Sequence, residues 1–253
     1  MRKVSESLDG RAIFMNLYPF SIGELMGSGK DNILDLLLAG KKVPKEGKQK
    51  GFNLNIKDFL WKGFMPVPQL QLKNESEITE WFDGYVTTYL ERDLRDVRGI
   101  SDLSDYKRFL KIMALYNGTI LDETAISREL QISQPTIHRY VGMLETTYII
   151  SKIPCFEKNK KKRVVKRPKI YWFDTGLVNF LAGNFTSKGL SEKKEYGLLF
   201  ETAVLHNLKV WASLKVPKPV IYYWRLCTGE KVDFIIEVGN KVIPIEIKAK
   251  KVI

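Results

Sequence analysis

The chain has 253 residues, 44% of them hydrophobic, so it can bury a core and form one or two domains. It contains 41 basic and 29 acidic residues, and its formal net charge of +12 favours an anionic partner, most commonly nucleic acid. Two cysteines without a CxxC pair, two histidines and no apolar run of 18 residues argue against a disulfide framework, a Cys/His zinc site and a membrane partner, and favour a soluble cytoplasmic protein.

The first fifty residues contain few strong signals for regular structure. Residues 31–38 predict a short helix, and residues 39–51 (AGKKVPKEGKQKG) predict an exposed linker. The segment GELMGSGKD has the look of a phosphate-binding loop, but five residues instead of four separate Gly23 and Gly29. Asp31 also replaces the Ser or Thr that would bind Mg²⁺. We therefore expect no ATP site in this chain.

Amphipathic patterns follow. Residues 76–98 predict a long helix, and residues 105–116 predict a second one. The segment 121–144 (LDETAISRELQISQPTIHRYVGML) has the punctuation of a helix-turn-helix, because Asp122 can cap the first helix and Ser133 the second.

The second of these helices has two distinct faces. One face is apolar and should be buried; it consists of Ile137, Tyr140, Val141 and Leu144. The other would face outward, where a recognition helix reads a major groove; it consists of Gln134, Thr136, His138 and Arg139. An ordinary helical hairpin would give the same pattern, so this alternative stays open.

A basic segment comes next. Residues 147–156 and 169–174 predict two strands, and the sequence EKNKKKRVVKRPK lies between them. A helix-turn-helix followed by a two-stranded ribbon is a winged helix, and the charges would let the wing hold a DNA backbone. The candidate phosphate contacts are Lys160, Lys161, Lys162, Arg163 and Arg167. The alternative is a merely solvated charged loop.

The C-terminal part predicts a helix followed by a hairpin. Residues 192–212 form an apolar helical pattern that includes Glu201, and residues 220–226 predict a strand. Residues 231–238 and 241–250 predict two more strands joined by a Gly-Asn turn.

The two-residue turn fixes the register of this hairpin. If Val238 faces Lys241, then Asp233 faces Glu246, with Cβ atoms about 4.5–5.5 Å apart. Two carboxylates so placed repel each other, which predicts either a bound cation or protonation of one group. Lys248 shares the face of Glu246, so the three side chains should converge.

This convergence suits phosphodiester hydrolysis. Asp233 and Glu246 would bind Mg²⁺, which prefers carboxylate oxygens and activates water. Lys248 would position that water or stabilise the phosphate, and Glu201 would support the metal site. Arg225 would contact phosphate or pair with a carboxylate. The alternative is an acidic pair and lysines on an exposed strand face.

The motifs of the C-terminal half resemble a known superfamily. Asp233, twelve intervening residues and Glu246-Ile247-Lys248, preceded by a helical Glu201, resemble the PD-(D/E)XK nucleases. The segments GLLFETAVLHNL, YYWRL, KVDFII and IPIEIKA look like the nuclease-like domain found C-terminal to a group of bacterial and archaeal AAA-type ATPases. YVTTYLERDLRDV, the helix-turn-helix and KIYWFDTGLVNFL resemble the same proteins, and residues 2–25 look like the tail of their ATPase domain.

The resemblance implies an α/β (α+β) fold, in which a winged-helix region precedes a restriction-endonuclease-like mixed sheet. We expect an ATPase-domain remnant and linker over residues 1–50, the winged-helix region over 51–188 and an incomplete nuclease-like domain over 189–253. The resemblance also implies that the family's fold continues beyond Ile253, so the chain looks like a fragment.

Three functions are consistent with these patterns. The chain is a DNA-binding, Mg²⁺-dependent nuclease-like module of an AAA-type ATPase, or a catalytically idle nucleic-acid or protein interaction module, or an ATPase fragment without its nucleotide site. The sequence leaves open the choice between DNA and RNA and the oligomeric state.

Overall fold

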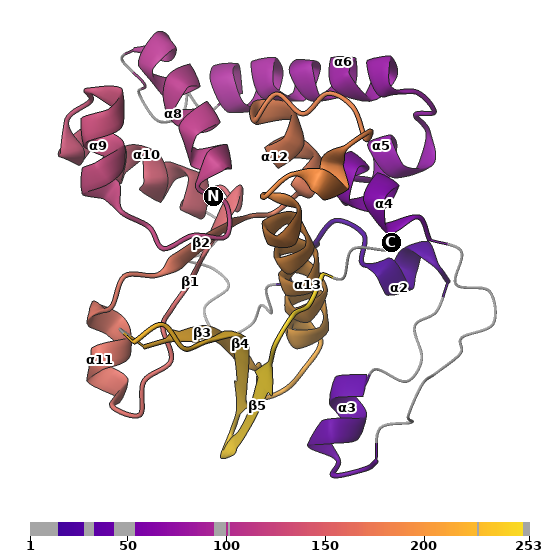
Figure 1. The fold of residues 1–253 in the computed structure, drawn as a ribbon, viewed down its shortest axis with the longest axis vertical. Helices are drawn as coiled ribbons and strands as arrows, with labels where there is room; N and C mark the ends of the chain where they lie inside the picture. The colour runs from indigo at the N-terminus through magenta and orange to yellow at the C-terminus, as the bar shows by residue number, and fades with distance from the viewer. Residues whose placement is uncertain are drawn as a thin grey trace, which may run out of the picture.

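The structure is a computed structural model that describes residues 15–27, 33–42, 54–93, 100, 102–226 and 228–249, with only the backbone of 91–93 (Figure 1). Helices form most of the described chain before residue 150, and a small antiparallel sheet lies near the C-terminal end. This confirms the predicted α+β class. None of the helices in these ranges is long and apolar enough to cross a membrane.

Short helices precede the predicted helix-turn-helix. In chain order they are α2 (Ile22–Leu25), α3 (Ile33–Leu38), α4 (Ile56–Lys62), α5 (Pro66–Leu70), α6 (Glu75–Tyr85), the π-helix η1 (Val86–Asp93) and α8 (Leu103–Leu115). The long helix predicted over 76–98 is therefore α6 continued by a π-helix, and its last residues, 94–98, lie outside the described ranges. Residues 43–51 of the predicted linker and residues 28–31 of the loop-like segment also lie outside them.

The helix-turn-helix is confirmed in its bounds and its caps. Asp122 accepts a hydrogen bond from the backbone N–H of Ala125 (3.0 Å), and Ser133 accepts one from that of Thr136 (3.4 Å). These bonds satisfy N–H groups that a helix start leaves unpaired. The predicted apolar face of the second helix is buried in the main helical core. The two helices are α9 (Glu123–Leu130) and α10 (Gln134–Thr146).

A two-stranded ribbon follows, which completes a winged-helix arrangement. Strand β1 (Ile150–Ile153) pairs antiparallel with β2 (Lys169–Trp172), and Ile120 adds a bridge to Lys169 ahead of α9. The tip of the ribbon differs from the predicted basic loop, because it contains a short helix, α11 (Lys160–Val165). Asn159 caps this helix by accepting from the N–H of Lys161 (3.0 Å).

The C-terminal unit is one long helix packed on a three-stranded sheet. Figure 1 shows α13 in the middle of the molecule, between the helical region and the sheet. Its apolar side chains share a core with the strands, formed in part by Leu205, Leu208, Trp211, Phe234 and Ile236. The unit consists of α13 (Tyr196–Ser213), β3 (Val220–Arg225), β4 (Lys231–Val238) and β5 (Lys241–Ile245). Before it, α12 (Thr175–Leu181) and η2 (Leu190–Glu192) pack into the main helical core.

The sheet has the predicted hairpin register but not the expected mixed direction. Val238 pairs with Lys241 and Phe234 with Ile245, which confirms the register. The order β3-β4-β5 is antiparallel throughout, because short hairpin connections reverse the chain. Within the described residues, parallel pairing is limited to one bridge between Cys155 and Tyr223.

A buried histidine fastens residues 15–20 to α13. The Nε2 atom of His206 donates to the carbonyl oxygens of Pro19 and Phe20, each at 3.1 Å. The ring also stacks on Phe64, with centroids 4.4 Å apart. Burial lowers the pKa of His206 to about 4, because the site disfavours a charged imidazolium.

This histidine predicts a pH-dependent stability. The unfolded chain binds a proton at His206 near pH 6.5 and the folded chain only near pH 4. Stability is therefore complete above pH 6.5 and falls as the pH drops toward 4, by up to about 1.4 kcal/mol per pH unit. Urea unfolding between pH 4 and 7 measures this slope. His206→Gln keeps an N–H donor but does not titrate, so its slope should be smaller, and equal slopes in the two proteins would contradict this assignment.

Candidate functional site

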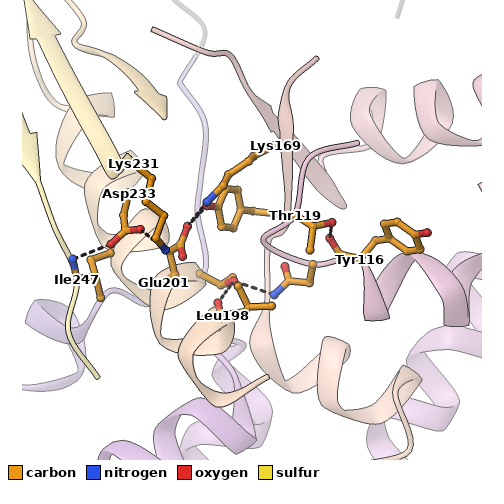
Figure 2. Close-up of polar contacts among 11 residues, drawn as sticks. Tyr116, Thr119, Lys169, Leu198, Glu201, Lys231, Asp233 and Ile247 are labelled. Atoms are coloured by element: carbon orange, nitrogen blue, oxygen red, sulfur yellow. Dashed lines mark hydrogen bonds and ion pairs between the residues drawn. The ribbon is translucent and has the colours of Figure 1, made fainter. Parts of the chain in front are cut away.

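A buried ion pair lies where the winged helix meets α13 (Figure 2). The Glu201 carboxylate accepts a hydrogen bond from the Lys169 ammonium (2.8 Å) and a short one from the Tyr171 hydroxyl. The Glu201 and Lys169 side chains are only 8% and 12% exposed. Lys169 and Tyr171 are two residues apart on β2, so both reach the same side of the ribbon.

Asp233 lies near this pair at the start of β4. Its Oδ2 atom accepts from the backbone N–H of Ile247 (2.8 Å), directly beyond the last paired residues of the hairpin. Its Oδ1 atom lies 3.3 Å from the Lys231 ammonium, although no hydrogen bond to that buried oxygen is formed among the described residues. Asp233 therefore holds the chain that follows β5, because its carboxylate accepts a backbone hydrogen bond at a point where strand pairing has ended.

The surroundings keep the Tyr171 hydroxyl protonated. Burial and the carboxylates of Glu201 and Asp233 raise the pKa of Tyr171 well above its usual value. A protonated hydroxyl is a donor, which is what the Glu201 carboxylate requires. Two carboxylates thus face two lysines and one phenol. Lys169 pairs with Glu201 and Lys231 lies beside Asp233, so each of these two carboxylates has an ammonium group nearby.

Glu246 and Lys248 lie at the exposed edge of this centre. Both are exposed and form an ion pair with each other, and the neighbouring carboxylate of Glu246 raises the pKa of Lys248. Asp233 bonds the N–H of Ile247, which lies between Glu246 and Lys248, and its charge also raises the pKa of Lys248. The three predicted residues are therefore neighbours, although no ion pair joins Lys248 to Asp233 among the described residues. Glu246 follows the last residue of β5, whose Ile243 and Ile245 pack against the core shared with α13.

The acidic residues of this centre do not form a metal-binding cluster by themselves. Among the described residues no group of three His, Cys, Asp or Glu side chains is placed to hold a metal ion. Glu201 is paired with Lys169, and the buried Oδ1 atom of Asp233 lies beside the Lys231 ammonium without a hydrogen bond. Mg²⁺ commonly takes one or two carboxylates together with waters and substrate phosphates, whereas here both carboxylates lie beside ammonium groups.

The face of α10 predicted to read a major groove is largely exposed to solvent. Gln134, His138 and Arg139 are exposed on α10, whereas Thr136 is half-buried and hydrogen-bonds Ser133. The Nδ1 atom of His138 lies 2.9 Å from a carboxylate oxygen of Glu123 on the preceding helix.

The wing lysines are also exposed to solvent, but Arg163 is held by a partner side chain. Lys160, Lys161 and Lys162 are exposed along α11. The Arg163 guanidinium instead donates two bonds to the Glu237 carboxylate (2.7 and 3.2 Å) and lies 4.6 Å from the ring centroid of Phe156. A structural role therefore replaces the phosphate contact expected of Arg163.

The last two predicted phosphate contacts lie on the surface. Arg167 is exposed and bonds the carboxylate of Asp122 (2.5 Å), the residue that caps α9. Arg225 is exposed at the end of β3, where it faces Lys231 across the ladder. Neither is committed to a buried contact.

Sequence patterns missed the lysines and the tyrosine of the acidic centre. Lys169 is the last residue of the basic segment EKNKKKRVVKRPK, and Lys169, Tyr171 and Lys231 are absent from the predicted site residues. Lys169 and Tyr171 are two residues apart, so they share one face of a strand. Because the buried Glu201 needs hydrogen-bond donors, this spacing could have identified them as its partners.

The Glu201–Lys169 pair should be essential for stability. Glu201→Ala leaves a buried ammonium unpaired, so we expect a loss of about 3–5 kcal/mol in urea unfolding. The double variant Glu201→Leu with Lys169→Met removes both charges and should recover most of that loss. Glu195→Ala, at an exposed position just before α13, is the matched control and should change stability by less than about 0.5 kcal/mol. A double variant no more stable than Glu201→Ala would refute the pairing.

Comparison with known proteins places the chain among uncharacterised relatives. The proteins Rv2008c of Mycobacterium tuberculosis and Mb2031c of Mycobacterium bovis are each 31% identical over 192 residues, which is 76% of this chain and 42% of theirs. The chain thus spans less than half the length of these curated relatives. No solved structure matches it significantly.

Two family models match in succession. "Domain of unknown function (DUF4143)" matches residues 196–253, and that domain is often found at the C-terminus of AAA-ATPase-like proteins. "Domain of unknown function (DUF8612)" matches residues 53–188, which is more than half of the chain. The chain therefore belongs to the DUF8612 family and carries a DUF4143 segment after it.

Proposed function

We propose that this chain is a DNA-binding module of an AAA-ATPase-like protein, and that its acidic centre serves structure instead of hydrolysis. One observation carries the proposal: an exposed polar helix face, on α10, is followed by a ribbon whose tip presents three consecutive free lysines. The net charge of +12 adds a general attraction for a polyanion.

The two surfaces have separate tasks in this proposal. Lys160, Lys161 and Lys162 neutralise phosphates, which gives affinity without sequence preference. Gln134 and Arg139 are of the types that reach adenine and guanine edges in a major groove. Duplex DNA is favoured over duplex RNA, because the major groove of RNA is too deep and narrow for a helix.

The acidic centre supports an idle nuclease-like fold. An active centre of this type would leave its carboxylates open to a metal ion and a phosphate. Here Glu201 holds β2 against α13, and Asp233 holds the chain after β5. Glu201, Asp233, Glu246 and Lys248 occur in the same order as in nucleases. In this proposal the order reflects a shared fold, and the residues no longer catalyse hydrolysis.

Replacing Lys160, Lys161 and Lys162 together by alanine should weaken binding of all duplex sequences alike. Each phosphate contact contributes about one to the salt slope of the affinity, so the slope should fall by up to about three. Fluorescence anisotropy between 50 and 200 mM salt measures it. Lys188→Ala, an exposed lysine between α12 and η2, is the control and should bind like the wild type. An unchanged slope in the triple variant would exclude the wing as a phosphate contact.

Magnesium should have no specific effect on this chain. We expect neither a rise in Tm with Mg²⁺ or Mn²⁺ nor cleavage of plasmid or branched DNA that Asp233→Asn abolishes. Asp233→Asn should lower Tm, because an amide is a weaker acceptor for the Ile247 N–H. Cleavage by the wild type that disappears in folded Asp233→Asn and Glu246→Ala would instead establish a nuclease and overturn the idle assignment.

A further inference from the structure

A large cavity lies between the winged helix and α13. Its volume is about 800 Å³, within the range of small-molecule sites. The walls come from residues 15–19, the end of α6 and η1, the turn after α10, strands β1 and β2, and one side of α13. None of the groups proposed to contact DNA lines it, so the cavity is separate from the DNA-binding face.

Aromatic side chains dominate one part of the lining. Tyr85 and Tyr89 contribute from α6 and η1, with ring centroids 5.4 Å apart, and Phe173 contributes from the segment after β2. Such rings bind flat aromatic ligands by stacking.

Tyr148, which also lines the cavity, occupies a position where glycine is favoured. It follows α10 with φ +63°, in the left-handed region that a side chain makes costly. Its N–H bonds the carbonyl of Glu145, as in a helix C-terminal turn, and the residue is 72% exposed. The fold gains no burial from this ring, so the strain is explained if the ring contacts a ligand.

A positive charge without an ion-pair partner among the described residues lies in another part of the lining. Lys209 on α13 donates to the Ser151 hydroxyl, and no described carboxylate pairs with its ammonium. Glu145 pairs with Lys152 at 2.9 Å and acts on Lys209 only from a greater distance, while Lys218 adds a second positive charge nearby. Burial and Lys218 lower the pKa of Lys209 to about 8. Two cations at a cavity wall favour an anionic group.

We propose that this cavity binds a small aromatic anion of about the size of a mononucleotide. Tyr148 and the tyrosines of α6 and η1 hold the aromatic ring, and Lys209 with Lys218 holds the anionic group. His206 lines the cavity too, but its Nε2 atom is bonded to Pro19 and Phe20 and shapes the wall. The site lies beside the turn that ends α10, which is the helix proposed to read DNA.

Isothermal titration calorimetry of the whole chain without DNA tests this site, with adenosine 5′-monophosphate and 1-naphthalenesulfonate as the anionic probes and adenosine as the neutral one. Saturable 1:1 binding of at least one anion is expected, with adenosine at least about tenfold weaker. Lys209→Met should weaken the anion at least about tenfold, since a charged hydrogen bond is lost. Lys188→Met is the matched control and should bind like the wild type.

Tyr148→Gly gives a second, independent readout. It relieves the positive-φ strain, so its Tm should equal or exceed that of the wild type, while anion binding weakens at least about fivefold through lost stacking. The proposal is overturned if neither anion binds, if adenosine binds as tightly as its monophosphate, or if both variants bind like the wild type.

Discussion

The buried pair of Glu201 and Lys169 is the constraint on which the arrangement of the two parts depends. Lys169 begins the second ribbon strand and Glu201 lies within α13, so one contact joins the winged helix to the C-terminal unit. A buried charge without its partner is costly, so neither part can separate from the other without exposing or stranding a charge. Nearby, Asn117 bonds the Thr202 hydroxyl (2.9 Å) and accepts from the Trp172 N–H (3.0 Å), which strengthens the same junction.

The same pair explains the chemistry of the centre. A glutamate in an apolar helix beside an aspartate on a strand is a pattern shared by metal sites and by buried ion pairs. The choice between them depends on what faces the oxygens. Here Lys169, Tyr171 and Lys231 face them, so the charges balance within the protein. The proposed DNA contacts are then the exposed residues of α10 and α11, far along the chain from the carboxylates.

Local signals were sufficient for much of the fold. The caps Asp122 and Ser133, the apolar face of α10 and the register set by Gly239 and Asn240 are all properties of short segments, and each is observed as predicted. Contacts between distant segments were not predictable in this way. The Glu201–Lys169 bond spans 32 residues and the His206–Pro19 bond spans 187, and no periodicity encodes either. Helix α11 was missed because its run of lysines has the composition of a loop, and its cap, Asn159, is a weak signal by itself.

The Arg163–Glu237 contact gives the wing a mechanical property. Arg163 lies on the ribbon tip and Glu237 on β4, and their side chains are only 10% and 22% exposed. A force on the lysines of α11 can therefore be transmitted to the C-terminal sheet through the two Arg163–Glu237 hydrogen bonds, and not only through the ribbon strands. The wing is braced at its tip as well as at its base, so it resists twisting away from the sheet. If a duplex binds the wing as proposed, a force that twists the duplex would pass through the Arg163–Glu237 contact to β4 and to the strands paired with it.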